Sequence, residues 1–92
     1  MSARVTLYSR PGCHLCDDAR AVVARVCEEL GEGFEEVDIT AGPEAGRLTA
    51  RYGEEVPVTL VDGRQHDFWR VDPDRLRAAL SAGGPAGGTR RR

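Results

Sequence analysis

The spacing of apolar and polar positions predicts how the chain opens. Residues 5–8 form a short β-branched and aromatic run that stops at the breaker-rich residues 9–12, as a strand does before a turn. From about residue 13 to 30, apolar residues recur three and four positions apart, and Gly31 follows them. This period predicts a long amphipathic helix with a glycine stop.

The middle of the chain predicts a strand, a helix and another strand. Residues 34–39 alternate apolar and acidic positions, which is typical of a strand. Residues 43–52 carry Leu48 and Tyr52 four positions apart, which favours a short helix. Residues 56–61 form an apolar run rich in β-branched residues, so we expect a third strand there.

The last part of the pattern contains a hairpin signal and a helix-start signal. Asp62-Gly63 suits the left-handed positions of a type I′ turn, so residues 64–68 are expected to return as an antiparallel strand. Asp72 followed by Pro73 suits a helix N-cap and the first helical position. The apolar residues that follow at helical spacing predict the last helix.

The predicted order is β-α-β-α-β-β-α, which places the chain in the α/β class. A strand-helix-strand start implies a parallel pair joined by a right-handed crossover, and the hairpin adds an antiparallel pair. We therefore expect a mixed four-stranded sheet flanked by three helices, in one domain over residues 1–82. Residues 83–92 are rich in glycine and end in three arginines, and we expect a flexible tail because they have almost nothing to bury.

Composition narrows the class of protein. The 92 residues are 40% hydrophobic and 30% charged, which suits a single globular domain. The formal net charge of −2 gives no sign of nucleic-acid binding. No apolar run is long enough to span a bilayer, and the N-terminus lacks the pattern of a secretion signal. We therefore expect a cytoplasmic monomer that binds neither nucleic acid nor membrane.

Candidate chemistry lies where the first strand meets the first helix, at the C-x-x-C pair of Cys13 and Cys16. Two cysteines three apart at a helix start approach closely enough for a disulfide, and the free amides and the helix dipole favour a thiolate on the first. By analogy with other C-x-x-C proteins, the pKa of Cys13 is expected to fall from about 8.5 into the range of roughly 3.5–7.5. Cys13 is the expected nucleophile and Cys16 the resolving thiol. Arg10 is a neighbouring cation that would add positive charge, and His14 is either a second such group or a solvated residue of the helix.

These features together resemble the glutaredoxin branch of the thioredoxin superfamily. The resemblance covers roughly residues 4–80 and rests on the order of elements, on Tyr-Ser-Arg-Pro-Gly-Cys at residues 8–13, and on Val56-Pro57 at the third strand. It implies a thioredoxin-like fold and an enzyme that exchanges thiols and disulfides. It also implies that Pro57 has a cis peptide bond and faces the cysteine pair, and that the backbone of Val56 pairs with the bound thiol substrate.

The chain departs from the glutathione-binding members of that branch at two places. Those proteins commonly have Thr-Val-Pro before the third strand and Gly-Gly-x-Asp before the last helix, whereas this chain has Glu55 before Val56, and Arg-Val-Asp at residues 70–72. Glutathione binding is therefore not assumed, and mycothiol is the other low-molecular-weight thiol that we consider. The composition, rich in arginine and without lysine, suggests a GC-rich coding sequence. This inference about the genome is the only reason for considering mycothiol.

The resemblance implies partners and no resident cofactor. The expected substrate is a disulfide-containing protein or a low-molecular-weight thiol in disulfide form. The expected electron donor is a reductase or a small thiol, because a dithiol that has been oxidised must be reduced again.

Two other functions stay open at this point. Zinc sites also use C-x-x-C spacing, and some glutaredoxins bridge an iron-sulfur cluster between two chains, so a metal-binding or carrier role is one alternative. A zinc site in one chain would need two further ligands, and Cys27 lies about 16 Å along the helix from Cys16 at about 1.5 Å rise per residue. The other alternative is an interaction module with a structural disulfide.

Three further residues have simpler interpretations. Cys27 shares the apolar face of the first helix, so we expect a buried apolar residue and not a reactive thiol. Phe68 and Trp69 end the fourth strand and are expected to pack against the last helix, with partner docking as the minority interpretation.

Overall fold

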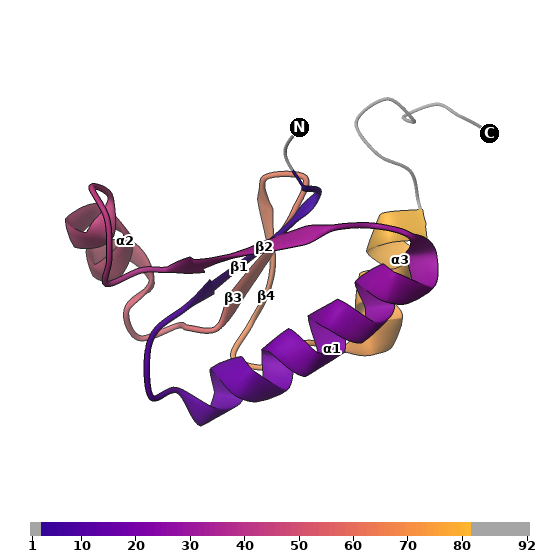
Figure 1. The fold of residues 1–92 in the computed structure, drawn as a ribbon, viewed down its shortest axis with the longest axis horizontal. Helices are drawn as coiled ribbons and strands as arrows, with labels where there is room; N and C mark the ends of the chain where they lie inside the picture. The colour runs from indigo at the N-terminus through magenta and orange to yellow at the C-terminus, as the bar shows by residue number, and fades with distance from the viewer. Residues whose placement is uncertain (1–2, 82–92) are drawn as a thin grey trace.

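The computed structural model describes residues 3–81, and the predicted tail at residues 83–92 lies outside them. Within residues 3–81 the order of elements is the predicted β-α-β-α-β-β-α. The strands are β1 (Val5–Ser9), β2 (Phe34–Asp38), β3 (Val58–Val61) and β4 (Arg64–Phe68). The helices are α1 (His14–Leu30), α2 (Ala45–Tyr52) and α3 (Pro73–Ser81) (Figure 1). No helix in this part of the chain is both long and apolar enough to cross a membrane.

The strands form one mixed sheet in the order β2-β1-β3-β4. β1 and β2 pair in parallel, as a strand-helix-strand unit requires, and β3 pairs antiparallel with both β1 and β4. The hairpin turns at Asp62 and Gly63, whose φ angles of 53° and 83° are the left-handed pair of a type I′ turn. The predicted fold class is therefore confirmed.

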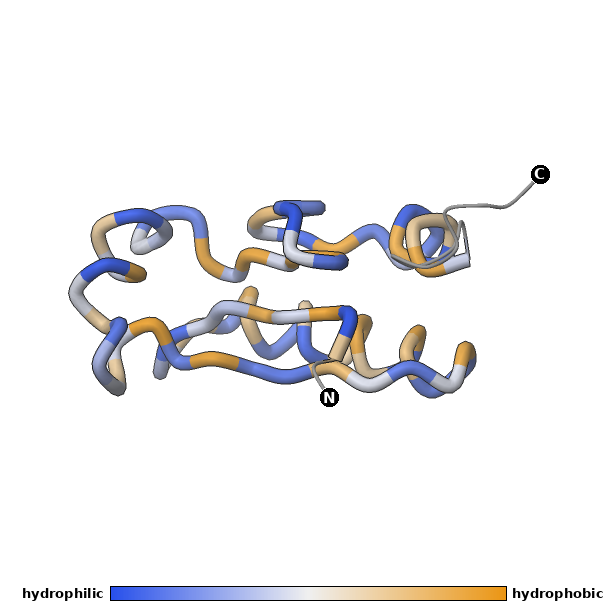
Figure 2. The backbone as a smooth tube through the Cα atoms, turned by 90° about the horizontal axis from the view of Figure 1, so that it is seen from above, coloured by the Kyte–Doolittle hydropathy of each residue, from blue (hydrophilic) through white to orange (hydrophobic). Residues whose placement is uncertain are grey.

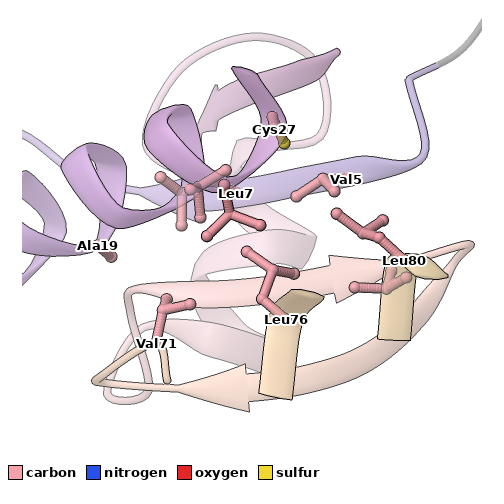
Figure 3. Close-up of a cluster of buried hydrophobic side chains, with 10 residues drawn as sticks. Val5, Leu7, Ala19, Cys27, Val71, Leu76 and Leu80 are labelled. Atoms are coloured by element: carbon pink, nitrogen blue, oxygen red, sulfur yellow. The ribbon is translucent and has the colours of Figure 1, made fainter. Parts of the chain in front are cut away.

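The larger buried cluster lies between one face of the sheet and the helices α1 and α3. We call it the main core, and its members are Val5, Leu7, Ala19, Val23, Val26, Cys27, Val61, Val71, Leu76 and Leu80. In Figure 3, Leu76 and Leu80 of α3 reach toward Leu7 and Val5 of β1. Seen from above, hydrophobic and hydrophilic positions alternate along the helices (Figure 2), and each helix buries one side only.

A smaller buried cluster lies at the C-terminal end of β1. We call it the cysteine cluster, and its buried members are Cys16, Ile39, Leu48 and Val56. Four partly buried residues pack against it, namely Tyr8, Cys13, Val37 and Tyr52. Successive residues of a strand point to opposite faces, so Leu7 and Tyr8 serve different clusters. The helix α2 thus contributes to the face opposite α1 and α3, and it lies at the other end of the molecule from α3 (Figure 1).

Two elements begin two residues later than the sequence predicts, whereas β1 ends one residue later and β2 one residue earlier than predicted. The helix α2 begins at Ala45 and not at residue 43, because the Ala45 N–H closes a turn onto the Gly42 carbonyl at 3.2 Å. The strand β3 begins at Val58 and not at residue 56, since Pro57 has no N–H to donate to the sheet.

The prediction that Phe68 and Trp69 pack against the last helix is wrong. Phe68 is 47% and Trp69 is 51% exposed. Trp69 has a φ of 65° and turns the chain at the end of β4. Its indole N–H donates to the Glu54 carbonyl at 3.1 Å, in the loop between α2 and β3. The ring is thereby held over that loop.

Candidate active site

The loop between β1 and α1 places Cys13 at the start of the helix. Gly12 has a φ of 75°, which glycine adopts without steric cost, and it leads the chain from β1 into α1. Cys13 is the N-cap residue, and its Sγ accepts a hydrogen bond from the Cys16 N–H at 3.1 Å. The sulfur therefore accepts a hydrogen bond from an amide N–H that has no partner within the helix. Such a position favours negative charge on the sulfur when the cysteine is reduced.

Cys13 and Cys16 form a disulfide, with their Cα atoms 5.1 Å apart. The two residues differ in their access to solvent. Cys16 is fully buried in the cysteine cluster, whereas Cys13 is only partly buried. An approaching molecule therefore meets Cys13 first, and this asymmetry is what an attacking and a resolving thiol need.

The segment before β3 lies against the same cluster. The peptide bond between Val56 and Pro57 is cis, and both residues are buried. Val56 belongs to the cysteine cluster with Cys16, so the segment and the cysteine pair meet at one end of the sheet. The Val56 N–H donates to the Tyr52 carbonyl at 3.1 Å, and the Pro57 carbonyl accepts from the Trp69 N–H at 2.8 Å. Hydrogen bonds from two different parts of the chain thus hold this segment.

Arg10 and His14 flank the cysteine loop, and both are exposed. Neither forms an ion pair with another residue of the described part of the chain. Arg10 lines an open cleft of about 330 Å³ together with Ser9, Pro11 and Arg20. The structure thus places these two predicted residues beside the cysteine pair and leaves their side chains accessible.

An ion-pair network that the sequence analysis missed borders that cleft. Glu36 of β2 accepts two hydrogen bonds from Arg20, at 2.7 and 2.6 Å, and one from the Ser9 hydroxyl at 2.7 Å. The Arg20 guanidinium, with a smaller contribution from Ser9, holds the pKa of Glu36 below its usual value, and the same pair raises the pKa of Arg20. Arg20 also bonds Asp17 in the first turn of α1, at 2.8 Å. The network ties the start of α1 to the sheet.

Trp69 is the second feature that the sequence analysis missed. Its two N–H groups bond the carbonyls of Glu54 and Pro57, at the two ends of the segment that carries the cis bond. A left-handed φ costs a residue with a side chain about 1–2 kcal/mol, so such a conformation persists only where the surroundings impose it. No local sequence signal marks this conformation, because the two carbonyl partners lie at least twelve residues earlier in the chain.

Cys27 lies in the main core and is 2% exposed, as predicted. Burial raises the pKa of its thiol, and the charge of Glu32 adds to this effect. Among residues 3–81, no group of three or more His, Cys, Asp or Glu side chains is arranged to hold a metal ion. Cys27 thus lies in a different buried cluster from the cysteine pair.

Two relatives with matching sequence cover most of the chain. An uncharacterized protein of Mycobacterium tuberculosis, Rv0508, is 36% identical over 80 residues, which cover 85% of this chain and 82% of the relative. The X-ray structure of protein XcR50 from X. campestris is 38% identical, has a TM-score of 0.67, and covers 86% of this chain and 97% of that one.

A more distant structure shares the fold. The glutaredoxin grx-1 from Archaeoglobus fulgidus is 20% identical, with a TM-score of 0.56 and coverage of 88% of both chains. The sequence family described as Glutaredoxin-like domain (DUF836) matches residues 4–81. The predicted glutaredoxin-like resemblance is therefore confirmed, and the chain belongs to this glutaredoxin-like family.

Proposed function

We propose that the protein is a thiol-disulfide oxidoreductase that works through Cys13 and Cys16. One observation carries the proposal. The two cysteines are bonded at the start of α1, and only Cys13, which caps the helix, is accessible. A structural disulfide does not need an accessible sulfur that accepts a hydrogen bond from a helix N–H. An attacking thiol does, because access lets it reach the substrate and the hydrogen bond stabilises its thiolate.

The proposed cycle begins with the reduced dithiol. The Cys13 thiolate attacks one sulfur of a substrate disulfide, so that a mixed disulfide forms and the first substrate thiolate leaves. The Cys16 thiol loses its proton and attacks the Cys13 sulfur, so the second substrate thiolate leaves. The substrate gains two electrons and the protein ends with the Cys13–Cys16 disulfide. An external dithiol reductase or two molecules of a small thiol then reduce that disulfide.

The neighbouring residues have supporting roles in this proposal. Val56 and Pro57 bind the substrate backbone beside the attacked sulfur, and the place of Val56 in the cysteine cluster supports this role. The Val56 N–H already donates to Tyr52, so a bond from this amide to a substrate must be shared or exchanged. Arg10 and His14 bring accessible cationic or potentially cationic groups to the rim, where they favour the thiolate and anionic substrates.

The external donor belongs to one of two chemical classes, a protein reductase or a low-molecular-weight thiol such as glutathione or mycothiol. The glycines by which backbone amides would approach a glutathione carboxylate are absent from residues 70–72. We place this exchange in the cytoplasm, where small thiols keep such pairs reduced.

A redox titration of the purified protein tests the proposal. The protein is equilibrated at defined dithiol potentials, alkylated, and analysed by peptide mass spectrometry, which reports Cys13, Cys16 and Cys27 separately. We expect a reversible Cys13–Cys16 couple within about −200 to −270 mV, the range of glutaredoxins and thioredoxin. A pair that stays bonded to far more negative potentials indicates a structural disulfide. A pair that never oxidises, in protein that carries stoichiometric zinc or iron, indicates a metal carrier.

Three substitutions assign the roles. Cys13→Ser should abolish turnover, because it removes the attacking sulfur. Cys16→Ser should accumulate a mixed disulfide at Cys13, visible as an added mass on the intact protein. Cys27→Ala is the matched control and should leave turnover unchanged, since Cys27 lies in the main core. Full turnover in Cys13→Ser would reject the proposal.

A further inference from the structure

The end of β4 carries two large apolar side chains on the surface. Within residues 3–81 the exposed large hydrophobic residues are Leu30, Phe68 and Trp69, at 39%, 47% and 51%. Leu30 is isolated at the end of α1, and a single exposed leucine is ordinary. Phe68 and Trp69 instead contact each other edge to face, with ring centroids 5.0 Å apart. We call them the aromatic pair.

Within the aromatic pair, Trp69 is held in place by the rest of the chain. Trp69 is fixed by two hydrogen bonds, from its backbone N–H to Pro57 and from its indole N–H to Glu54. Its φ of 65° is strained for a bulky residue, and strained residues cluster at binding sites. A rigid aromatic side chain loses little conformational entropy when a partner binds, which is why such residues are common binding anchors.

Trp69 connects the aromatic pair to the proposed active site in two ways. Trp69 bonds directly to Pro57, which the proposed function assigns to substrate binding. On the other side, a hollow of about 110 Å³ separates Trp69 from α1. The wall contributed by α1 includes Leu15, which lies between the two cysteines in the sequence, and Val22. The hollow thus lies between the cysteine helix and the end of β4, with apolar residues contributed from both.

The hollow suits one kind of occupant. Its volume is several times the roughly 30 Å³ that a water molecule occupies in the liquid, and it has room for one aliphatic side chain. Asp18 and Arg70 add charged groups to its lining, and charged groups around an apolar centre are typical of protein interfaces. A small thiol such as glutathione consists almost entirely of charged and amide groups, so it would gain little from burying this surface.

We propose that the aromatic pair and the hollow beside it dock a polypeptide, so that the preferred substrate is a protein disulfide with an aliphatic residue near its cysteine. This inference rests on the proposed function and names its substrate class. The peptide lies across Val56 and Pro57, its cysteine sulfur meets Cys13, and its aliphatic side chain enters the hollow beside Trp69.

Steady-state kinetics with two substrates provide the first test. Insulin is the protein disulfide, bis(2-hydroxyethyl) disulfide is the small one, and dithiothreitol supplies electrons. Phe68→Thr leaves both hydrogen bonds of Trp69 in place and keeps a strand-forming residue. It should lower kcat/KM for insulin at least about fivefold, mainly through KM, as loss of an interface anchor does. Its kcat/KM for the small disulfide should stay within about twofold of the unsubstituted protein, because this substrate has no apolar side chain to bury against the aromatic pair.

Two further variants complete the kinetic test. Trp69→Asn removes the ring and keeps a residue that tolerates the left-handed backbone, and combined with Phe68→Thr it should lower kcat/KM for insulin at least about tenfold. Leu30→Gln removes the isolated exposed leucine and should leave kcat/KM unchanged for both substrates. Equal losses for both substrates in Phe68→Thr, or unchanged insulin reduction in the double variant, would overturn the docking inference.

Fluorescence provides a second test that needs no turnover. Trp69 is the single tryptophan of the chain, so its emission reports the aromatic pair directly. Cys16→Ser protein is joined at Cys13 to a thiopyridyl-activated peptide with leucine beside its cysteine, to the same peptide with serine there, or to 2-mercaptoethanol. Only the leucine peptide should shift the emission to shorter wavelength. Identical emission from all three adducts would overturn the docking inference, whereas failure of the unsubstituted protein to reduce either disulfide would overturn the proposed function.

Discussion

The main core and the cysteine cluster are both apolar, but they differ in size and closure. The main core has ten buried members and joins α1, α3 and two strands. The cysteine cluster has four buried members, and its partly exposed neighbours include Cys13 and two tyrosines. A large closed cluster contributes most of the burial that stabilises a fold. The smaller open one keeps a sulfur buried while its partner stays accessible.

The helix α1 passes through both clusters and carries a buried cysteine in each. Cys16 lies in the cysteine cluster near its start, and Cys27 lies in the main core near its end. A buried thiol is alkylated only when its surroundings open, so its rate of alkylation reports local stability. The two cysteines therefore allow the clusters to be probed separately in the reduced protein.

The largest expected effect comes from a cavity in the main core. Leu76 of α3 is fully buried there. Leu76→Ala should lower the free energy of unfolding by about 2–5 kcal/mol, because it removes buried methyl groups and leaves a cavity. Urea denaturation of the oxidised protein measures this loss. In the reduced protein, Cys27 should be alkylated faster while Cys16 changes less.

The control for this variant is the same substitution on the surface. Leu30→Ala should change the free energy of unfolding by less than about 0.5 kcal/mol, because Leu30 is already exposed. If Leu76→Ala accelerated the alkylation of Cys16 and Cys27 equally, the two clusters would open as one unit and the distinction between them would fail.

A matched cavity in the cysteine cluster should cost less. Leu48 of α2 is 3% exposed and packs in the cluster with Cys16. Leu48→Ala should destabilise the protein by about 2 kcal/mol, at the lower end of the range for such changes, because an open cluster relaxes more easily around a cavity. Alkylation of Cys16 in the reduced protein should accelerate several-fold, and that of Cys27 should not. A loss as large as that of Leu76→Ala would contradict the ranking.

The main core could be predicted from the sequence because its signals are local. The apolar residues of α1 repeat every three or four positions, and the Asp62-Gly63 turn fixes the hairpin between β3 and β4. The position of the cysteine pair between a strand and a helix could be predicted in the same way. Each of these signals can be read from residues that are close in the sequence, within one helix, strand or turn.

The surroundings of the site were harder to predict because they depend on long-range contacts. Trp69 donates hydrogen bonds to Glu54 and Pro57 from a left-handed backbone conformation. No turn motif in the sequence around Trp69 indicates this conformation. The hydrogen bonds that Arg20 donates to Glu36 join residues sixteen positions apart in the chain. The cis bond before Pro57 was expected from the family resemblance and not from the residues themselves, since proline alone favours the trans form.

The smallest expected effect concerns the ion pair between Arg20 and Glu36 beside the cysteine loop. The Arg20 guanidinium lowers the pKa of Glu36 in the folded protein. The ionised carboxylate therefore stabilises the fold at pH values above the unfolded pKa of about 4.3, and this contribution is lost as the pH falls through the lower folded pKa. Glu36→Gln should destabilise the protein by less than about 1 kcal/mol at pH 7, because the pair is partly exposed.

The pH dependence separates this pair from general surface charge. The stability difference between the Glu36→Gln variant and the unsubstituted protein should be constant above about pH 5 and shrink below about pH 4.3. Urea denaturation at each pH measures it. Glu35→Gln changes an exposed carboxylate of the same strand that forms no ion pair within residues 3–81, and it should show a smaller difference. If Glu36→Gln cost as much as Leu48→Ala, the Arg20–Glu36 pair would stabilise the cysteine end of the sheet as strongly as the buried cluster does.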